Sequence, residues 1–316
     1  MAGLVARIRS NPHLRFLTPS ILVDWAVVLI LGQATYYVEQ IYPYERDPAH
    51  YFNDPDLQWP HGGERVPAYP GGLLDQLTWY LPILVIVLVG GLFKRSLHDV
   101  HHGILGLSAS RAFMRMIVDG DLDEILTVQV GRLRPDFFSR CQWDAVAHAC
   151  TGPLALVKDG RRSFPSGHSS TAWQGLFFLS LYLAGKNGAY AFAAPFPRSG
   201  PLQSRLLRLT IVLAPLFVAG YIVITRLEDH YHHPTDVLTG SFIGASTAFF
   251  TYLTYYPSPV VLSTPPGSEE AEERLRVMER PKRVYGVKEV GDGWEEGERV
   301  EQGRVRLGGA DGEAVV

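Results

Sequence analysis

Three short segments of the chain carry residues that could bind a phosphate and cleave its ester bond. They are Gly-Arg-Leu-Arg-Pro at 131–135, Phe-Pro-Ser-Gly-His at 164–168 and Thr-Arg-Leu-Glu-Asp-His-Tyr-His-His-Pro-Thr-Asp at 225–236. Cleavage of a phosphate monoester needs cations on the phosphoryl oxygens, an in-line nucleophile and an acid for the leaving oxygen. Because the three segments together supply these groups, they predict a single phosphate site that works without a metal ion.

The predicted phosphate ligands come from all three segments. Arg132, Arg134 and Arg226 have planar guanidinium groups that can bind two phosphate oxygens at once. Ser166 and Gly167 directly precede an apolar stretch, and a helix that begins there offers a hydroxyl, free backbone N–H groups and the positive end of its dipole. We expect these five residues to surround the phosphate.

Two histidines are the candidates for the bond-breaking steps. His232 and Asp236 are four residues apart, which is one helical turn if a helix begins near Pro234. A carboxylate on one ring nitrogen fixes the tautomer and leaves the other nitrogen free to attack phosphorus. We therefore predict His232 as the nucleophile, Asp236 as its orienting partner, and His168 as the acid for the leaving alcohol and the base for water.

Membrane-length apolar stretches must position these segments. A helix needs about 20 apolar residues to cross a bilayer, and six stretches qualify: 20–40, 73–93, 103–127, 169–186, 208–226 and 236–256. The third contains Arg111, Arg115 and several acidic residues, which are costly in lipid unless they pair or face the bundle. We keep it because the topology requires an even number of spans. The prediction is an all-α, six-transmembrane-helix bundle over residues 20–256.

The two ends of the chain are expected to lie outside this bundle. Residues 1–19 form a short basic segment, and residues 257–316 combine charge runs and glycines with few large apolar groups. Such a composition cannot bury enough surface to offset the entropy of ordering, so we predict a disordered tail. The net charge of −3 and the lack of a basic, aromatic-rich surface speak against nucleic acid as a partner.

Lysine and arginine set the predicted orientation in the membrane. The N-terminal segment and the 187–207 loop are basic without acidic residues, and the 94–102 loop opens with Lys94 and Arg95. These parts and the tail are therefore assigned to the cytosol. The loops at 41–72, 128–168 and 227–235 then face the lumen or the outside of the cell, so all three segments fall on one face of the membrane.

Both cysteines, Cys141 and Cys150, lie in one of those outward-facing loops. Such a pair suggests a disulfide if the loop faces an oxidising compartment. Two unpaired thiols are the alternative.

The three segments resemble the signature of the type 2 phosphatidic acid phosphatase family, or lipid phosphate phosphatases. That signature is Lys-x6-Arg-Pro, then Pro-Ser-Gly-His, then Ser-Arg-x5-His-x3-Asp, and the resemblance covers the core at about 20–256. It implies a metal- and cofactor-independent membrane hydrolase that forms a phosphohistidine on a lipid phosphate. Carried over, it implies the phosphate ligands Arg134, Ser166, Gly167 and Arg226, and the roles given above for His168, His232 and Asp236.

Residues 135–137 and 140–141 further resemble fungal members that act on phosphatidate, lysophosphatidate and diacylglycerol pyrophosphate. The chain departs from the signature at two positions. Thr225 replaces a serine and keeps the hydroxyl, whereas Thr127 replaces the lysine of the first motif. Loss of that charge could cost on the order of 3 kcal/mol, roughly a hundredfold in rate. The cations that could compensate are Arg132, Lys158, Arg161 and Arg162.

Thr127 therefore keeps open a second hypothesis, which is a catalytically weakened or silent lipid-binding protein on the same fold.

Two metal-dependent alternatives have less support. The His-x-x-His-His pattern at 98–102 fits a di-iron oxidase, but the histidines of the third segment lie across the membrane from it. A zinc hydrolase could use His230, His232 and His233. Vanadate-dependent haloperoxidases share the three motifs but are soluble. The sequence predicts neither the preferred lipid, nor the membrane, nor the oligomeric state.

Overall fold

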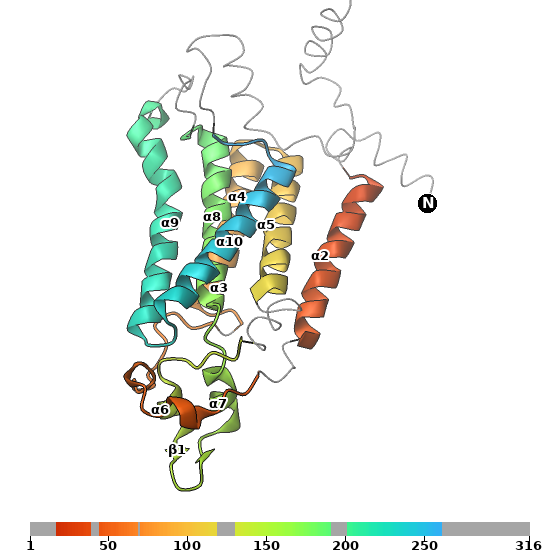
Figure 1. Cartoon of the computed structure of the whole chain (residues 1–316). Coiled ribbons are helices and arrows are strands. Elements are labelled where there is room, and N and C mark those ends of the chain that lie inside the picture. The colour runs from red at the N-terminus through yellow and green to blue at the C-terminus, as the bar shows by residue number, and fades with distance from the viewer. Residues whose placement is uncertain (1–16, 39–43, 69, 119–129, 191–200, 261–316) are drawn as a thin grey trace, which may run out of the picture. The chain divides into compact units, whose positions relative to one another are not determined.

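The computed structural model describes residues 17–38, 44–68, 70–118, 130–190 and 201–260, and these residues are mostly helical (Figure 1). The chain divides into two units. One comprises residues 1–18 and 283–316, of which only Leu17 and Thr18 are described. The other, residues 19–282, holds every helix and strand of the described residues, and the description below concerns this unit.

Six helical stretches of at least 20 residues occur in the described part of the chain. Five are single helices, and the sixth is a continuous run at Leu73–Phe93 made of α3 (Leu73–Asp75), η3 (Gln76–Tyr80), α4 (Leu81–Ile86) and η4 (Val87–Phe93), in which η3 and η4 are π-helical. The five single helices are α2 (Pro19–Val38), α5 (Leu97–Val118), α8 (Gly167–Asn187), α9 (Arg205–Glu228) and α10 (Pro234–Tyr255).

Three of these stretches, Leu73–Phe93, α9 and α10, are long and apolar enough to cross a membrane. In α2 the apolar part is shorter, at Pro19–Thr35. The other two helices, α5 and α8, bury polar side chains such as Asp99 and Gln174, which lowers their mean hydropathy. The expected span at 103–127 is displaced, because α5 runs from Leu97 to Val118 and residues 119–129 lie outside the described part.

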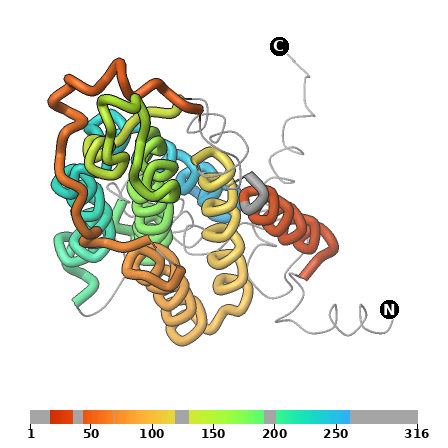
Figure 2. The backbone as a smooth tube through the Cα atoms, turned by 90° about the horizontal axis from the view of Figure 1, so that it is seen from below, coloured from red at the N-terminus to blue at the C-terminus, as the bar shows by residue number. Residues whose placement is uncertain are grey.

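Helix α8 packs against α5, α9, α10 and η3 (Figure 2). Glycines let its backbone approach two of these neighbours. A Cβ on Gly240 of α10 would lie 2.4 Å from the carbonyl oxygen of Ser166, and one on Gly244 would lie 2.1 Å from that of Ser170. On α8 itself, a Cβ on Gly175 would lie 2.0 Å from the carbonyl oxygen of Thr78. These contacts leave no room for side chains and fix the start of α8 against the start of α10.

Short elements form a cap beyond the starts of α8 and α10 (Figure 1). They are η1 (Pro48–Tyr51), η2 (Pro55–Leu57), α6 (Phe137–Cys141), the antiparallel pair β1 (Trp143–Asp144) and β2 (Ala149–Cys150), and α7 (Leu154–Gly160). A separate 3-10 turn, η6 (Pro201–Gln203), precedes α9. The cap has a small apolar core of Leu57, Leu133, Phe137, Phe138, Cys141 and Val157.

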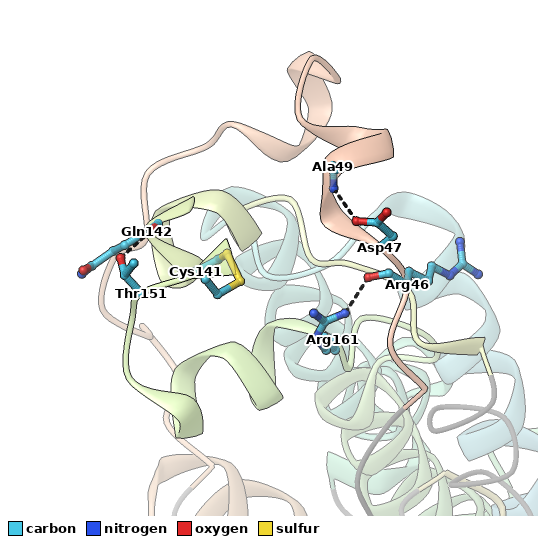
Figure 3. The surroundings of a disulfide bond; sticks show 8 residues. Arg46, Asp47, Ala49, Cys141, Gln142, Thr151 and Arg161 are labelled. Atoms are coloured by element: carbon cyan, nitrogen blue, oxygen red, sulfur yellow. Dashed lines mark hydrogen bonds between the residues drawn. A yellow bond between two sulfur atoms is a disulfide. The ribbon is translucent and has the colours of Figure 1, made fainter. Parts of the chain in front are cut away.

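A disulfide between Cys141 and Cys150 closes the loop that carries the β1–β2 pair (Figure 3). The hydroxyl of Thr151 donates to the carbonyl of Gln142 at 2.7 Å beside it. Residues 44–68 lie over the same cap, where Arg161 donates to the carbonyl of Arg46 at 2.8 Å. The cap therefore joins residues 44–68 to the segment between α5 and α8.

Candidate functional site

The second and third sequence segments meet where α8 and α10 begin. Ser166 is the N-cap of α8, and its hydroxyl oxygen accepts from the backbone N–H of Ser169. The backbone N–H of Ser166 donates to the carbonyl of Asp236 at 3.0 Å. Gly167 and His168 are the first two residues of α8, so the positive end of that helix dipole lies at this junction.

His232 is buried in the connection between α9 and α10, and its Nδ1 lies 2.6 Å from the carbonyl oxygen of Ser163. Because a carbonyl only accepts, we assign the hydrogen of the neutral ring to Nδ1, which leaves the Nε2 lone pair free. Burial holds the pKa of His232 well below its usual range, and the charges of Arg134 and His168 lower it further. At neutral pH this ring is therefore an uncharged imidazole, the form that acts as a nucleophile.

Asp236 does not hold His232 in the way that the four-residue spacing predicts. Its carboxylate accepts from Ser163 Oγ at 2.6 Å, from Arg132 Nη1 at 2.6 Å, and from His233 through Nδ1 at 3.1 Å and the backbone N–H at 3.0 Å. His233 is the N-cap of α10, so His232 lies outside the helix while Asp236 turns back toward the cap. Asp236 reaches His232 only through Ser163, which donates to Asp236 by its hydroxyl and accepts from His232 by its carbonyl.

His168 faces a residue that the sequence did not indicate as part of the site. Its Nε2 lies 3.1 Å from the carbonyl oxygen of Val66 and 3.8 Å from Oε2 of Glu64. The other oxygen of Glu64 lies 3.8 Å from Nη1 of Arg226. Burial alone would raise the pKa of Glu64, but the contact with His168 and the charges of His168, Arg226 and Arg134 outweigh it and lower this pKa. An ionised carboxylate thus lies among the predicted phosphate ligands.

Three buried arginines surround the ring of Tyr231. The guanidinium carbons of Arg134, Arg140 and Arg226 lie 5.2, 4.6 and 5.6 Å from the ring centre. An aromatic face attracts cations, and here it holds three of them together without neutralising their charge. The hydroxyl of Tyr231 donates to the carbonyl of Gly62 at 3.0 Å, which fixes the ring.

Two nitrogens of this arginine group lack a hydrogen bond within the described part of the chain. Arg134 donates to Asp159 at 2.9 Å, and Arg140 donates to Asp136 at 2.8 Å and to Asp159. Yet Nη2 of Arg140 and Nη1 of Arg226 are buried and have no hydrogen-bond partner among the described residues. Leaving a buried donor unsatisfied costs free energy, and the oxygens of a bound phosphate would supply the missing acceptors.

One of the two residues that depart from the signature, and two of the cations that could compensate for the other, lie in different surroundings. Thr225 Oγ1 accepts from Nε and Nη2 of Arg226 at 3.3 Å, so the retained hydroxyl supports that arginine. Arg132 contacts Asp236 and donates to Thr235 at 2.7 Å, apart from the group around Tyr231. Arg161 points into the cap (Figure 3). Thr127 lies outside the described residues.

The sequence reasoning missed four members of the site, which are Arg140, Glu64, Ser163 and Tyr231. The resemblance around Arg140-Cys141 contained a signal for the first, but it was used only to compare substrates. Glu64 lies in a loop without periodicity, and its charge entered only the prediction of the orientation in the membrane. Within the described ranges, no cluster of three His, Cys, Asp or Glu side chains is arranged to hold a metal ion.

A cavity of about 430 Å³ opens beside His168, between the starts of α3 and α8 and the last turns of α5. Gly167, His168 and Thr171 line it on one side, and Asp75, Arg111 and Arg115 on another. A second hollow, of about 550 Å³, lies in the cap between Phe52 and Trp143 and contains no residue of the three segments. Only the first cavity is therefore continuous with the site.

Comparison with known proteins gives consistent matches. The model of the PAP2 superfamily matches residues 109–258. Lipid phosphate phosphatase 2 of Arabidopsis thaliana is 34% identical over 250 residues, which cover 75% of this chain and 77% of that protein. Diacylglycerol pyrophosphate phosphatase 1 of Saccharomyces cerevisiae is 29% identical over 248 residues, which cover 73% and 77%. No solved structure matches the chain significantly.

The similarity to the plant protein extends over three quarters of both chains, and the matched family region contains all three segments. Apolar helices long enough to cross a bilayer agree with a membrane protein. The chain therefore belongs to the PAP2 superfamily, and it is a phosphatase of phosphoric monoesters.

Proposed function

We propose that the protein is a lipid phosphate phosphatase that hydrolyses phosphatidate-like phosphomonoesters, including phosphatidate, lysophosphatidate and diacylglycerol pyrophosphate, without a metal ion. The observation that carries the proposal is the hydrogen bond that fixes the hydrogen of buried His232 on Nδ1, in the field of Arg134 and Arg226, together with Nη1 of Arg226, which is buried without a hydrogen-bond partner among the described residues. The names of the plant and yeast relatives support a lipid as the substrate.

In the first step, Nε2 of His232 attacks phosphorus while Arg134 and Arg226 bind the phosphoryl oxygens. An N–P bond forms, the P–O bond to the lipid breaks, and its electron pair goes to the leaving oxygen. Protonated His168 donates its proton to that oxygen. Glu64, 3.8 Å away, stabilises the protonated form of His168 until then. The backbone N–H groups at the start of α8, with Ser166 and Gly167, complete the anion site.

In the second step, neutral His168 takes a proton from a water molecule whose oxygen attacks phosphorus. The N–P bond breaks, its electron pair returns to His232, and inorganic phosphate leaves. The site then has His168 protonated and His232 neutral, as at the start. Asp236 acts through Ser163, whose carbonyl keeps the hydrogen of His232 on Nδ1.

We place this reaction on the lumenal or extracellular side of a membrane that all six long helices cross. The N-terminal segment at 1–19 and the tail at 257–316 are then cytosolic. The contrast between the basic 187–207 loop and the acidic 41–72 loop supports this orientation. A buried polar face on α5 and α8 is compatible with inner helices that neighbours shield from lipid.

The second candidate is a weakened or silent lipid-binding protein, and Thr127 in place of the family lysine favours it. Phosphate release from micellar phosphatidate in excess EDTA separates the two. We expect release by the wild type and a rate roughly a hundredfold higher for Thr127→Lys, because a charged contact is restored. No release by the wild type at any lipid concentration would sink the enzyme proposal. A Thr127→Lys protein no faster than wild type would refute our account of that position.

A further inference from the structure

The cavity beside His168 carries two arginines that the reaction above does not use. Arg111 and Arg115 stand four residues apart on α5, so both lie on one face of the helix, and both line the cavity. Arginines within a largely apolar helix of a membrane protein are costly and mark functional positions more often than not. Their place in a cavity shared with His168 and Gly167 calls for a ligand.

Arg111 is held in position and yet incompletely bonded. Its Nη2 donates to Oδ1 of Asp75 at 2.6 Å, and its guanidinium carbon lies 4.9 Å from the ring centre of Trp79. Its Nη1 is buried and has no hydrogen-bond partner among the described residues. A guanidinium fixed on one edge by a carboxylate and on one face by an aromatic ring is ready to bind an anion with its remaining edge.

The position of the cavity assigns it to the leaving group. His168, which protonates the leaving oxygen, lines the cavity, whereas His232 does not. In-line attack by His232 drives the leaving group away from His232 and toward the acid that protonates it, which is His168 on the wall of the cavity. An alcohol offers Nη1 of Arg111 a single neutral oxygen, whereas a phosphate presents several charged oxygens to that nitrogen, which has no hydrogen-bond partner among the described residues.

We propose that Arg111 and Arg115 form a second anion subsite that binds the non-transferred phosphate of a diphosphate substrate. This rests on the proposed function. In the first step Nε2 of His232 forms an N–P bond with the terminal phosphorus, the bond from that phosphorus to the bridging oxygen breaks, and its electron pair goes to that oxygen. The leaving group is a phosphate monoester, which Arg111 and Arg115 retain while water hydrolyses the phosphohistidine.

The kinetic test compares diacylglycerol pyrophosphate with phosphatidate, both as dioctanoyl lipids in detergent micelles with EDTA. We expect Arg111→Gln and Arg115→Gln each to lower the ratio of kcat/KM values, diphosphate over monophosphate, by about tenfold. Asp75→Asn should preserve or raise this ratio, because it removes a negative charge from the cavity. The control is Arg205→Gln, an exposed position at the start of α9, which should leave the ratio unchanged.

Equal losses on both lipids, or a fall in the ratio for Asp75→Asn like that for Arg111→Gln, would show that the Arg111–Asp75 pair is only structural and would overturn the subsite. If the wild type hydrolyses neither lipid, the proposed function fails and binding decides the subsite. Methylenediphosphonate should then raise the Tm of the wild type more than methylphosphonate does, and Arg111→Gln should lose this difference. Equal shifts in the wild type would overturn the subsite.

Discussion

The two ends of α8 and α10 both bury charge, but they do so in opposite ways. At the far end, Asp99 of α5 accepts from Lys186 at 2.6 Å, from Tyr182 at 2.9 Å and from Tyr256 at 3.1 Å. At the other end, Nη1 of Arg226 and Nη2 of Arg140 are buried without a hydrogen-bond partner among the described residues, and Nη1 of Arg226 meets Glu64 only at 3.8 Å. The Asp99 cluster is electrostatically complete, whereas the arginine group still has donors to offer.

This difference indicates that the Asp99 cluster stabilises the fold, whereas the arginine group can bind an anion. A buried ion pair whose oxygens are all engaged contributes to a defined packing and leaves nothing for a ligand. A buried cation group with open donors costs stability in the unbound protein and gains it back when an anion arrives. Mutations in the Asp99 cluster should therefore change mainly the stability, and mutations in the arginine group should change mainly the turnover.

The largest expected effect is the loss of turnover in His232→Ala. Removal of the nucleophile should lower phosphate release from phosphatidate by about 10⁴-fold or more, with little change in Tm. His50→Ala is the matched control, because His50 is exposed in η1 and contacts only Asp47 among the described ion pairs. A His232→Ala protein with a tenth of the wild-type rate would rule out a phosphohistidine at this position.

At the Asp99 end, Lys186→Met should act on stability and not on the chemistry. It leaves the Asp99 carboxylate buried without its cation, and the unfolding free energy should fall by about 3–5 kcal/mol. The double variant Asp99→Asn, Lys186→Met should recover part of that loss. Thermal unfolding in detergent measures both, and kcat at a temperature where each variant is folded should match the wild type. A large drop in kcat would mean that the two ends are coupled.

Arg226→Lys keeps the charge but removes the planar fork, so it tests the arginine end directly. We expect kcat/KM for phosphatidate to fall by roughly a hundredfold. Arg65→Lys is the comparison, because Arg65 is half exposed and pairs with the exposed Glu228 as well as with the buried Asp229. A similar fall in both variants would indicate a general loss of the loop structure.

The smallest effect is expected from Glu64→Gln, and it depends on pH. Since the folded pKa of Glu64 lies below its ordinary value of 4.5, the ionised carboxylate stabilises the folded state above pH 4.5. That contribution is lost as the pH falls through the lower folded value. The Tm of Glu64→Gln should therefore lie below that of the wild type at pH 7, and the gap should close as the pH falls below 4.5 and through the lowered folded pKa. A gap that is constant with pH would refute the ion contacts with His168 and Arg226.

Much of the fold was predictable because long apolar stretches and helix-breaking residues are local signals. All six expected helices occur, and five of them begin within a few residues of their predicted starts. The exception is α5. This helix begins at Leu97, earlier than predicted. Its first turns contain His98, Asp99 and His102, which are partly or fully buried, and a prediction from hydropathy assigns such polar residues to a loop. The number of helices that cross a membrane stays a prediction.

Only those site residues that belong to the three motifs could be predicted from the sequence. The spacing of His232 and Asp236 has meaning within a helix, but α10 begins at Pro234, so His232 lies before it and takes a backbone carbonyl instead. Glu64 and Ser163 are held in the site by contacts from distant parts of the chain. No periodicity in the sequence encodes those contacts.

The disulfide between Cys141 and Cys150 is also a built-in marker of sidedness. The chain has two cysteines in all, so every thiol that a reagent detects comes from this one cap. In sealed vesicles of known orientation, labelling by a membrane-impermeant maleimide after an impermeant reductant reports which side the cap faces. The chain lacks an Asn-x-Ser/Thr glycosylation site, so this pair is its natural reporter of the compartment in which the phosphatase works.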